Sequence, residues 1–210
     1  MRKLLLCSLL LLLVTVAQLP ATPVLCTTLA TLQDYLNADS GGGCYVQDKL
    51  FTNFTYSGGG VSASNVAVTA TLSLLPGIDI HGFTFVPKTV WTSAFKLDYD
   101  ISVIPPSPEV IVSALDQYNV GPGANAATLS STKSNGVVFN LTSANATESA
   151  AFSPLTTLHS SVSATIPANA FIISLEEQYE QEVMTAEPVT LLLIGSGLAA
   201  LGILRRRITV

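Results

Sequence analysis

The sequence predicts an all-β protein: a single antiparallel β-sandwich-like ectodomain with one short N-terminal helix, followed by a C-terminal transmembrane helix. Apolar and polar residues alternate with a period of two along much of the chain, and Gly, Pro and Asn-Gly turns separate these stretches. No repeat of roughly 20 to 50 residues is evident, which argues against a solenoid or a propeller. Residues 27–182 are enough for one domain and too few for two.

The N-terminus has the pattern of a secretory signal peptide, which we assign to residues 1–21. Met1-Arg2-Lys3 precedes an apolar run from Leu4 to Ala17, and small residues follow at plausible cleavage positions up to Ala21. The run is 14 residues long. An uncleaved anchor is the alternative, but a membrane span needs roughly 20 residues. We therefore expect the mature ectodomain to occupy residues 22–182.

The first predicted element of the ectodomain is a short helix within residues 27–36. Leu29, Leu32 and Leu36 recur at helical spacing after threonines that can cap a helix, and the glycines at 41–43 end it. Cys26 and Cys44 flank this segment. Because export leads to an oxidising compartment, we predict a disulfide between them that closes a loop of about 19 residues. A redox role is the alternative, but no Cys-x-x-Cys spacing is present.

The remaining elements are predicted to be strands. Residues 95–103 show the clearest pattern, because Phe95, Leu97 and Tyr99 alternate with polar residues. Similar patterns, some weaker, predict strands at residues 50–56, 66–74, 78–85, 110–115, 126–129, 137–141, 158–166 and 171–175. Asn135-Gly136 predicts a tight hairpin. The acidic residues 176–187 are predicted to form a solvated stalk.

The C-terminal segment, residues 183–210, has the pattern of a membrane anchor. Glu187-Pro188 precedes an uncharged apolar run at residues 189–204, and Arg205, Arg206 and Arg207 follow it. A helix over this run would be about 24 Å long against a hydrocarbon core of roughly 30 Å, so spanning requires local thinning or snorkelling arginines. A buried core helix is the alternative, which the arginines disfavour. The positive-inside bias of these arginines predicts that residues 22–186 lie on the far side of the membrane from the cytoplasm.

This tail resembles the PEP-CTERM sorting signal, and the match rests on Glu187, Pro188, the stretch Gly195-Ser196-Gly197-Leu198, Arg205, Arg206 and Arg207. Ala186 stands where the family has its first proline. The resemblance implies an exported protein of a Gram-negative bacterium that is processed by an exosortase and associated with exopolysaccharide or biofilm.

The body also resembles a group of PEP-CTERM proteins, through the segment from Cys26 to Tyr35 and the order Gly43-Cys44, Asp48-Lys49 and Phe54-Thr55-Tyr56. This resemblance implies a cell-surface or matrix protein without an assigned activity.

Composition and motifs disfavour several kinds of function. Between the basic residues of the two ends, from Leu4 to Leu204, four lysines accompany fourteen acidic residues, so the ectodomain is expected to repel nucleic acid. His81 and His159 are isolated and no Gly-x-Ser-x-Gly motif is present, so we predict no cofactor, no metal and no catalytic triad.

Asp98 and Asp100 are expected about 7 Å apart on one strand face, where paired carboxylates can hydrolyse a glycoside. A wet outer face is the simpler interpretation of this pair. Calcium at Asp79, Asp98 or Asp100 is a further alternative, although no EF-hand loop is present.

The leading prediction is a non-enzymatic exported protein that is held in the inner membrane by its tail, processed, and then structural or adhesive in the exopolysaccharide matrix. The alternative is a carbohydrate-binding module displayed at the cell surface. Trp91 and Tyr99 are its candidate glycan contacts, because aromatic rings stack on sugars. Trp91 also suits the core, since sandwiches commonly bury one tryptophan.

Overall fold

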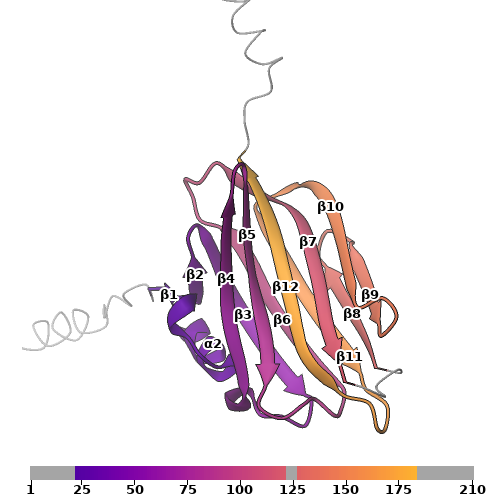
Figure 1. Ribbon diagram of the computed structural model, residues 1–210. Coiled ribbons are helices and arrows are strands. Elements are labelled where there is room, and N and C mark those ends of the chain that lie inside the picture. The colour runs from indigo at the N-terminus through magenta and orange to yellow at the C-terminus, as the bar shows by residue number, and fades with distance from the viewer. Residues whose placement is uncertain (1–21, 122–126, 184–210) are drawn as a thin grey trace, which may run out of the picture.

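The computed structural model describes residues 22–121 and 127–183, which form two stacked β-sheets (Figure 1). The predicted signal peptide and the predicted membrane helix at residues 189–204 lie outside this part of the chain. Within the described residues, no helix has the length and apolar character needed to cross a membrane.

The predicted all-β sandwich with one short helix is confirmed for the described residues. The seven-stranded sheet has the order β1 (Val24–Leu25), β2 (Cys44–Val46), β3 (Lys49–Gly58), β6 (Phe95–Val103), β11 (Thr157–Thr165), β8 (Thr128–Lys133) and β9 (Val138–Thr142). The five-stranded sheet has the order β10 (Thr147–Leu155), β7 (Glu109–Val120), β12 (Ile172–Val183), β5 (Ile78–Pro87) and β4 (Val66–Leu75). Neighbouring strands are antiparallel, except that β1 and β2 are parallel. Helix α2 (Leu32–Ala38) and the 3-10 turns η1 (Cys26–Thr28), η2 (Asp39–Gly41) and η3 (Ala63–Asn65) complete the described elements.

Helix α2 begins later than predicted because its cap is Thr31. The Asp34 backbone N–H donates to Thr31 Oγ1 at 3.4 Å, and the Thr31 backbone N–H donates to the Asp34 carboxylate at 2.9 Å. This reciprocal capping box fixes the first turn at Leu32. Leu32 and Tyr35 face the core.

The predicted disulfide between Cys26 and Cys44 is confirmed, and both cysteines are fully buried. The bond ties η1, just before α2, to strand β2. The Tyr35 hydroxyl donates to the Cys26 carbonyl at 2.9 Å, which packs the helix against the same point.

We expect the double variant Cys26→Ala/Cys44→Ala to lose about 3 kcal/mol of unfolding free energy, because the closed loop no longer restricts the unfolded chain. Urea denaturation of the oxidised wild type and the variant measures this difference. Dithiothreitol should lower the wild-type midpoint and leave the variant unchanged. Equal stability of oxidised wild type and variant would contradict this expectation.

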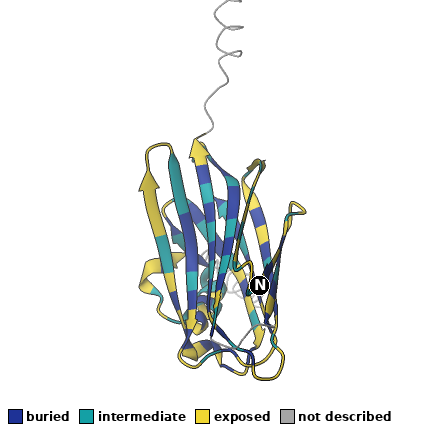
Figure 2. Ribbon diagram, turned by 45° about the vertical axis from the view of Figure 1, so that its right-hand side comes forward, coloured by how far each residue is buried: buried dark blue, intermediate teal, exposed yellow. Residues whose placement is uncertain are grey.

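The core between the sheets is rich in aromatic rings. The ring centroids of Phe83 and Tyr99 lie 4.6 to 6.3 Å from each other and from those of Phe51 and Phe54, mostly edge to face. Buried residues alternate with exposed ones along several strands, as the period-two pattern predicts (Figure 2).

The predicted stalk is wrong for residues 176–183, which belong to β12, the central strand of the five-stranded sheet. Glu177, Tyr179 and Gln181 alternate inward and are buried. A run of acidic residues ordinarily stays in solvent, but here Glu177 has a lysine partner inside the sandwich.

The edge strand β10 was not predicted, because its residues are mostly small or polar and show little apolar alternation.

The predicted Asn135-Gly136 hairpin is confirmed as the connection between β8 and β9. The Gly136 N–H donates to the Lys133 carbonyl at 2.9 Å, and Gly136 has φ of +89°. This left-handed conformation is the reason for glycine at the position.

Candidate functional site

A polar groove of about 360 Å³ opens on the seven-stranded sheet. It forms beyond the end of β8, because β8 pairs with β11 only from Ser160 onward and residues 157–159 of β11 have no partner in β8. We call it the Asp100 groove, and its lining residues are Thr52, Asp100, Ile101, Ser102, Ser134, Thr157, Leu158 and His159. Inward Tyr99, Ile101 and Leu158 alternate with the polar residues, so the groove lies on the outer face of the sandwich.

A carboxylate and an imidazole meet in this groove, and the Asn53 amide contacts the carboxylate from beside the lining. His159 Nδ1 lies 2.5 Å from Asp100 Oδ1, and Asn53 Nδ2 donates to Asp100 Oδ2 at 2.6 Å. Asn53 has φ of +58° at an irregularity in the β3–β6 register, and this bulge turns its amide toward Asp100. The Asp100 carboxylate is therefore held on both oxygens while it remains partly exposed.

The backbone of the groove is also held in place. The Ser134 N–H donates to the His159 carbonyl at 3.0 Å, and the His159 N–H donates to Ser134 Oγ at 3.0 Å. These two bonds join the turn after β8 to β11. The Ser134 hydroxyl is thus held beside His159 in the groove.

Asp98 and Asp100 both lie on the outer face of β6 as predicted, but Asp98 is only 9% exposed and the two carboxylates have different partners. Asp98 lies 3.1 Å from Lys96 Nζ and accepts from Thr55 Oγ1 at 3.0 Å. Partial burial opposes ionisation, but hydrogen bonds from Ser161, Lys96 and Thr55 lower the pKa of Asp98 overall. A glycosidase acid needs a raised pKa, so Asp98 does not suit that role.

Neither candidate glycan contact is available to a ligand, so the choice of Trp91 and Tyr99 is corrected. Trp91 is 1% exposed and donates to the Tyr56 hydroxyl at 2.8 Å, which confirms its core role. Tyr99 is 0% exposed, and its hydroxyl lies 2.9 Å from that of Tyr179. Tyr99 points inward because it lies between the outward-facing Asp98 and Asp100 on β6, and the Trp91 ring packs against Phe95 in the core. Among the described residues, the exposed large hydrophobic side chains are all aliphatic.

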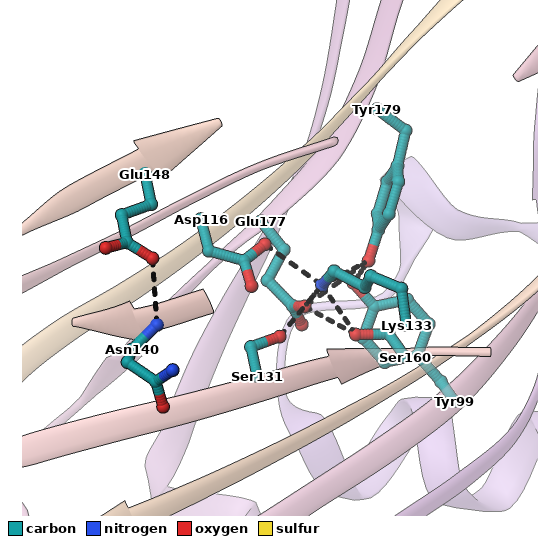
Figure 3. A network of polar contacts seen from close by, with 9 residues as sticks. All are labelled: Tyr99, Asp116, Ser131, Lys133, Asn140, Glu148, Ser160, Glu177 and Tyr179. Atoms are coloured by element: carbon teal, nitrogen blue, oxygen red, sulfur yellow. Dashed lines mark hydrogen bonds and ion pairs between the residues drawn. The ribbon is translucent and has the colours of Figure 1, made fainter. Parts of the chain in front are cut away.

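A second polar group, the Lys133 network, is buried between the sheets (Figure 3). Lys133 Nζ lies 3.0 Å from Asp116 Oδ1 and 2.6 Å from Glu177 Oε1. It also donates to Ser131 and Ser160, at 3.0 and 2.9 Å. Lys133, Asp116 and Glu177 come from β8, β7 and β12 and are each 0% exposed. The network is closed to solvent, so its role is structural.

The Lys133 ammonium group forms ion pairs with two carboxylates in this network, those of Asp116 and Glu177. Burial, and then the Glu177 charge, raises the pKa of Asp116 to about 6. Burial by itself lowers the pKa of Lys133, but Glu177, Tyr179 and Asp116 raise it overall, so Lys133 stays protonated. One oxygen each of Asp116 and Glu177 has no hydrogen-bond partner. The network therefore needs its lysine.

Sequence reasoning missed this network. Lys133 precedes a turn, where a lysine is usually solvated. A usable signal was present in β7, where Asp116 lies between inward-facing Ala114 and Tyr118 at a spacing of two.

A third polar group lies toward the end of the sandwich where β12 finishes. Buried Lys49 lies 2.7 Å from Asp48, and Gln181 Nε2 donates to Glu109 at 2.7 Å. His81 is fully buried, and neither ring nitrogen has a hydrogen-bond partner. Burial, followed by the Lys49 charge, lowers the pKa of His81 to about 4. Across residues 22–121 and 127–183, no group of three or more His, Cys, Asp or Glu side chains could hold a metal ion.

No known protein family matches the sequence. The comparison with curated proteins likewise finds no match.

Solved structures with a similar arrangement include FlhE, at 11% identity and a TM-score of 0.34, covering 51% of this chain and 99% of FlhE. The carbohydrate-binding module TmCBM61, solved with β-1,4-galactotriose, is 13% identical with a TM-score of 0.30, covering 59% of this chain and 86% of the module. The family 32 module of C. perfringens NanJ, solved with galactose, is 14% identical with a TM-score of 0.25, covering 63% of this chain and 93% of that module. The TM-scores are low, so function rests on the residues of this chain.

Proposed function

We propose that this chain is an exported, membrane-held β-sandwich protein that binds a polysaccharide through the Asp100 groove. The observation that carries the proposal is the pairing of Asp100 with His159 in an open, hydroxyl-lined groove on the outer sheet face, with Asn53 holding the second oxygen of Asp100. The proposal includes no catalytic step.

The groove chemistry suits sugar hydroxyl groups. A carboxylate accepts hydrogen bonds from neighbouring hydroxyls of one sugar ring, and such charge-assisted bonds are stronger than neutral ones. Serine and threonine hydroxyls both donate and accept, so Ser102 and Thr157 complement either role of a sugar hydroxyl. The ectodomain is rich in acidic residues, which favours an uncharged polysaccharide over an acidic one.

Two observations support the proposal that the chain is exported and held at a membrane. The Cys26–Cys44 disulfide is typical of proteins that fold in an oxidising compartment. The apolar run at residues 189–204 with its arginines favours a membrane anchor, and the PEP-CTERM-like tail makes an exosortase the proposed processing partner. Delivery to the cell surface would bring the groove to the exopolysaccharide.

Asp100→Ala is expected to weaken polysaccharide binding roughly 10- to 100-fold, because hydrogen bonds to a charged group contribute about 1.5–3 kcal/mol each. Affinity electrophoresis of the full chain in detergent, through gels that contain different neutral polysaccharides, measures the change in dissociation constant.

Asp98→Ala is the matched control, since Asp98 lies on the same strand and face but outside the groove lining. It should change binding less than about twofold by the affinity relation. Urea midpoints identify any variant that has lost its fold. Retardation of wild type and Asp100→Ala to the same extent in every gel would contradict the proposal.

A further inference from the structure

Strand β12 finishes beside the turn between β4 and β5. Gln181 pairs with Asp79, the second residue of β5, and Val183 pairs with Glu109, the first residue of β7. The hairpin of β4 and β5 therefore turns at the same end of the sandwich at which β12 ends (Figure 1).

This turn carries an apolar surface without cover. Leu72, Leu74 and Leu75 are 44%, 62% and 50% exposed, and Pro76-Gly77 follows them. We call these five residues the hairpin tip. The arrowhead end of β4 is correspondingly exposed (Figure 2). Leu72 and Leu74 pair with His81 and Asp79 on the edge of the five-stranded sheet, where nothing in the opposite sheet covers them.

The chain that leads into the hairpin tip is uncharged, and the nearest charged residue along the chain is Asp79, two residues after Gly77. Residues 50–78 contain no Lys, Arg, Asp or Glu. Leu72 and Leu74 lie on one face of the end of β4 and Leu75 lies on the other, so the tip is apolar on both faces. Exposed apolar surface of this kind marks contact with a membrane or a protein. Single exposed aliphatic residues elsewhere need no such explanation.

The number of residues between β12 and the proposed membrane segment favours a membrane over a protein as the partner of the tip. Val189, the first residue of the proposed membrane segment, is six residues beyond Val183. Six residues span at most about 20 Å when extended. If residues 189–204 occupy a bilayer, the end of the sandwich that carries the hairpin tip must lie close to the lipid headgroups.

We propose that the hairpin tip inserts Leu72, Leu74 and Leu75 into the interfacial region of the bilayer that holds the C-terminal segment. This inference rests on the proposed membrane attachment. Asp79, Glu109 and Glu182 lie at the same end, so the surface that fits is a zwitterionic leaflet rather than an anionic one. With the tail, the tip gives the sandwich a second point of contact and so fixes its tilt on the membrane.

Fluorescence quenching by brominated lipid tests the contact in the full chain. Leu74→Trp adds an indole at the tip, and Ile173→Trp adds one at a 39% exposed position at the far end of β12. The native Trp91 is buried at the end opposite the tip and serves as a constant background. Both variants are reconstituted in phosphatidylcholine vesicles with and without dibrominated acyl chains.

The added emission of Leu74→Trp is expected to shift to the blue and to fall at least twofold in brominated vesicles. The added emission of Ile173→Trp should not change. Leu75→Trp repeats the measurement at a second tip position, so that a local folding defect in one variant does not decide the outcome.

The failures are distinguishable. If the full chain does not float with the vesicles, both the membrane attachment and the tip contact are wrong. If it floats but the tip emission is not quenched, only the tip contact is wrong. A blue shift without quenching that grows with the protein-to-lipid ratio would show that a second copy of the chain covers the tip, which also overturns the inference.

Discussion

Replacing Lys133 with methionine is expected to lower the unfolding free energy by about 3–5 kcal/mol, because the change leaves two buried carboxylates without their cation. Lys133 holds Asp116 at 3.0 Å and Glu177 at 2.6 Å, and no water reaches any of the three. Methionine fills a similar volume, so the loss reports the charge and not a cavity. Urea denaturation monitored by circular dichroism measures the difference.

A triple variant separates two effects on the unfolding free energy: the cost of leaving two carboxylates unpaired, and the contribution of the network as a whole. Lys133→Met/Asp116→Leu/Glu177→Met replaces the three charged groups with apolar side chains. It should be more stable than Lys133→Met alone, because a buried ion triad is often replaceable at little cost once no charge is left unpaired. A single variant within about 1 kcal/mol of wild type would show that the network does not depend on its lysine.

Between pH 4 and 6 the two buried groups with the largest pKa shifts in this range, His81 and Asp116, should change the stability of the wild type in opposite directions and largely offset each other. The pKa of His81 falls to about 4 in the folded protein from 6.5, so its contribution is present above pH 6.5 and is lost as the pH falls toward 4. The pKa of Asp116 rises to about 6 from 3.8, so its contribution is present below pH 3.8 and is lost as the pH rises toward 6.

Single variants should reveal each slope. Asp116→Asn leaves the His81 slope, so stability should fall by about 3 kcal/mol from pH 6.5 to pH 4. His81→Phe leaves the Asp116 slope, so stability should rise by about 3 kcal/mol as the pH falls from 6 to 4. Urea denaturation at half-unit pH intervals measures both. Parallel pH profiles for wild type and the two variants would contradict this balance.

Several features of the fold could be predicted from local sequence, because each depends on a few residues that are close together in the chain. The strand Phe95–Val103 was predicted with its observed bounds, since alternation alone sets which side chains face the core. The Asn135-Gly136 turn depends on one left-handed residue. The Cys26–Cys44 bond was predicted from two cysteines close in the chain and from the predicted export.

The candidate site was not predictable in the same way. His159 and Asp100 are 59 residues apart, and Asn53 and Asp100 are 47 apart. Their meeting requires the β3–β6–β11 order of strands and the bulge at Asn53. The sequence pointed to Trp91 and Tyr99 instead, because an aromatic side chain suits both a sugar and a core.

The sequence by itself determined the apolar and basic character of the two chain ends and the alternation that makes an all-β body. It also determined the local turns, the helix cap and the disulfide. Only the tertiary structure decided which charged residues are buried. It placed Glu177 of the acidic run against Lys133 and brought Asp100 and His159 together on the outer face. The physical reason is that strand pairing joins residues far apart in the chain, and a charge enters a core only where such a distant partner receives it.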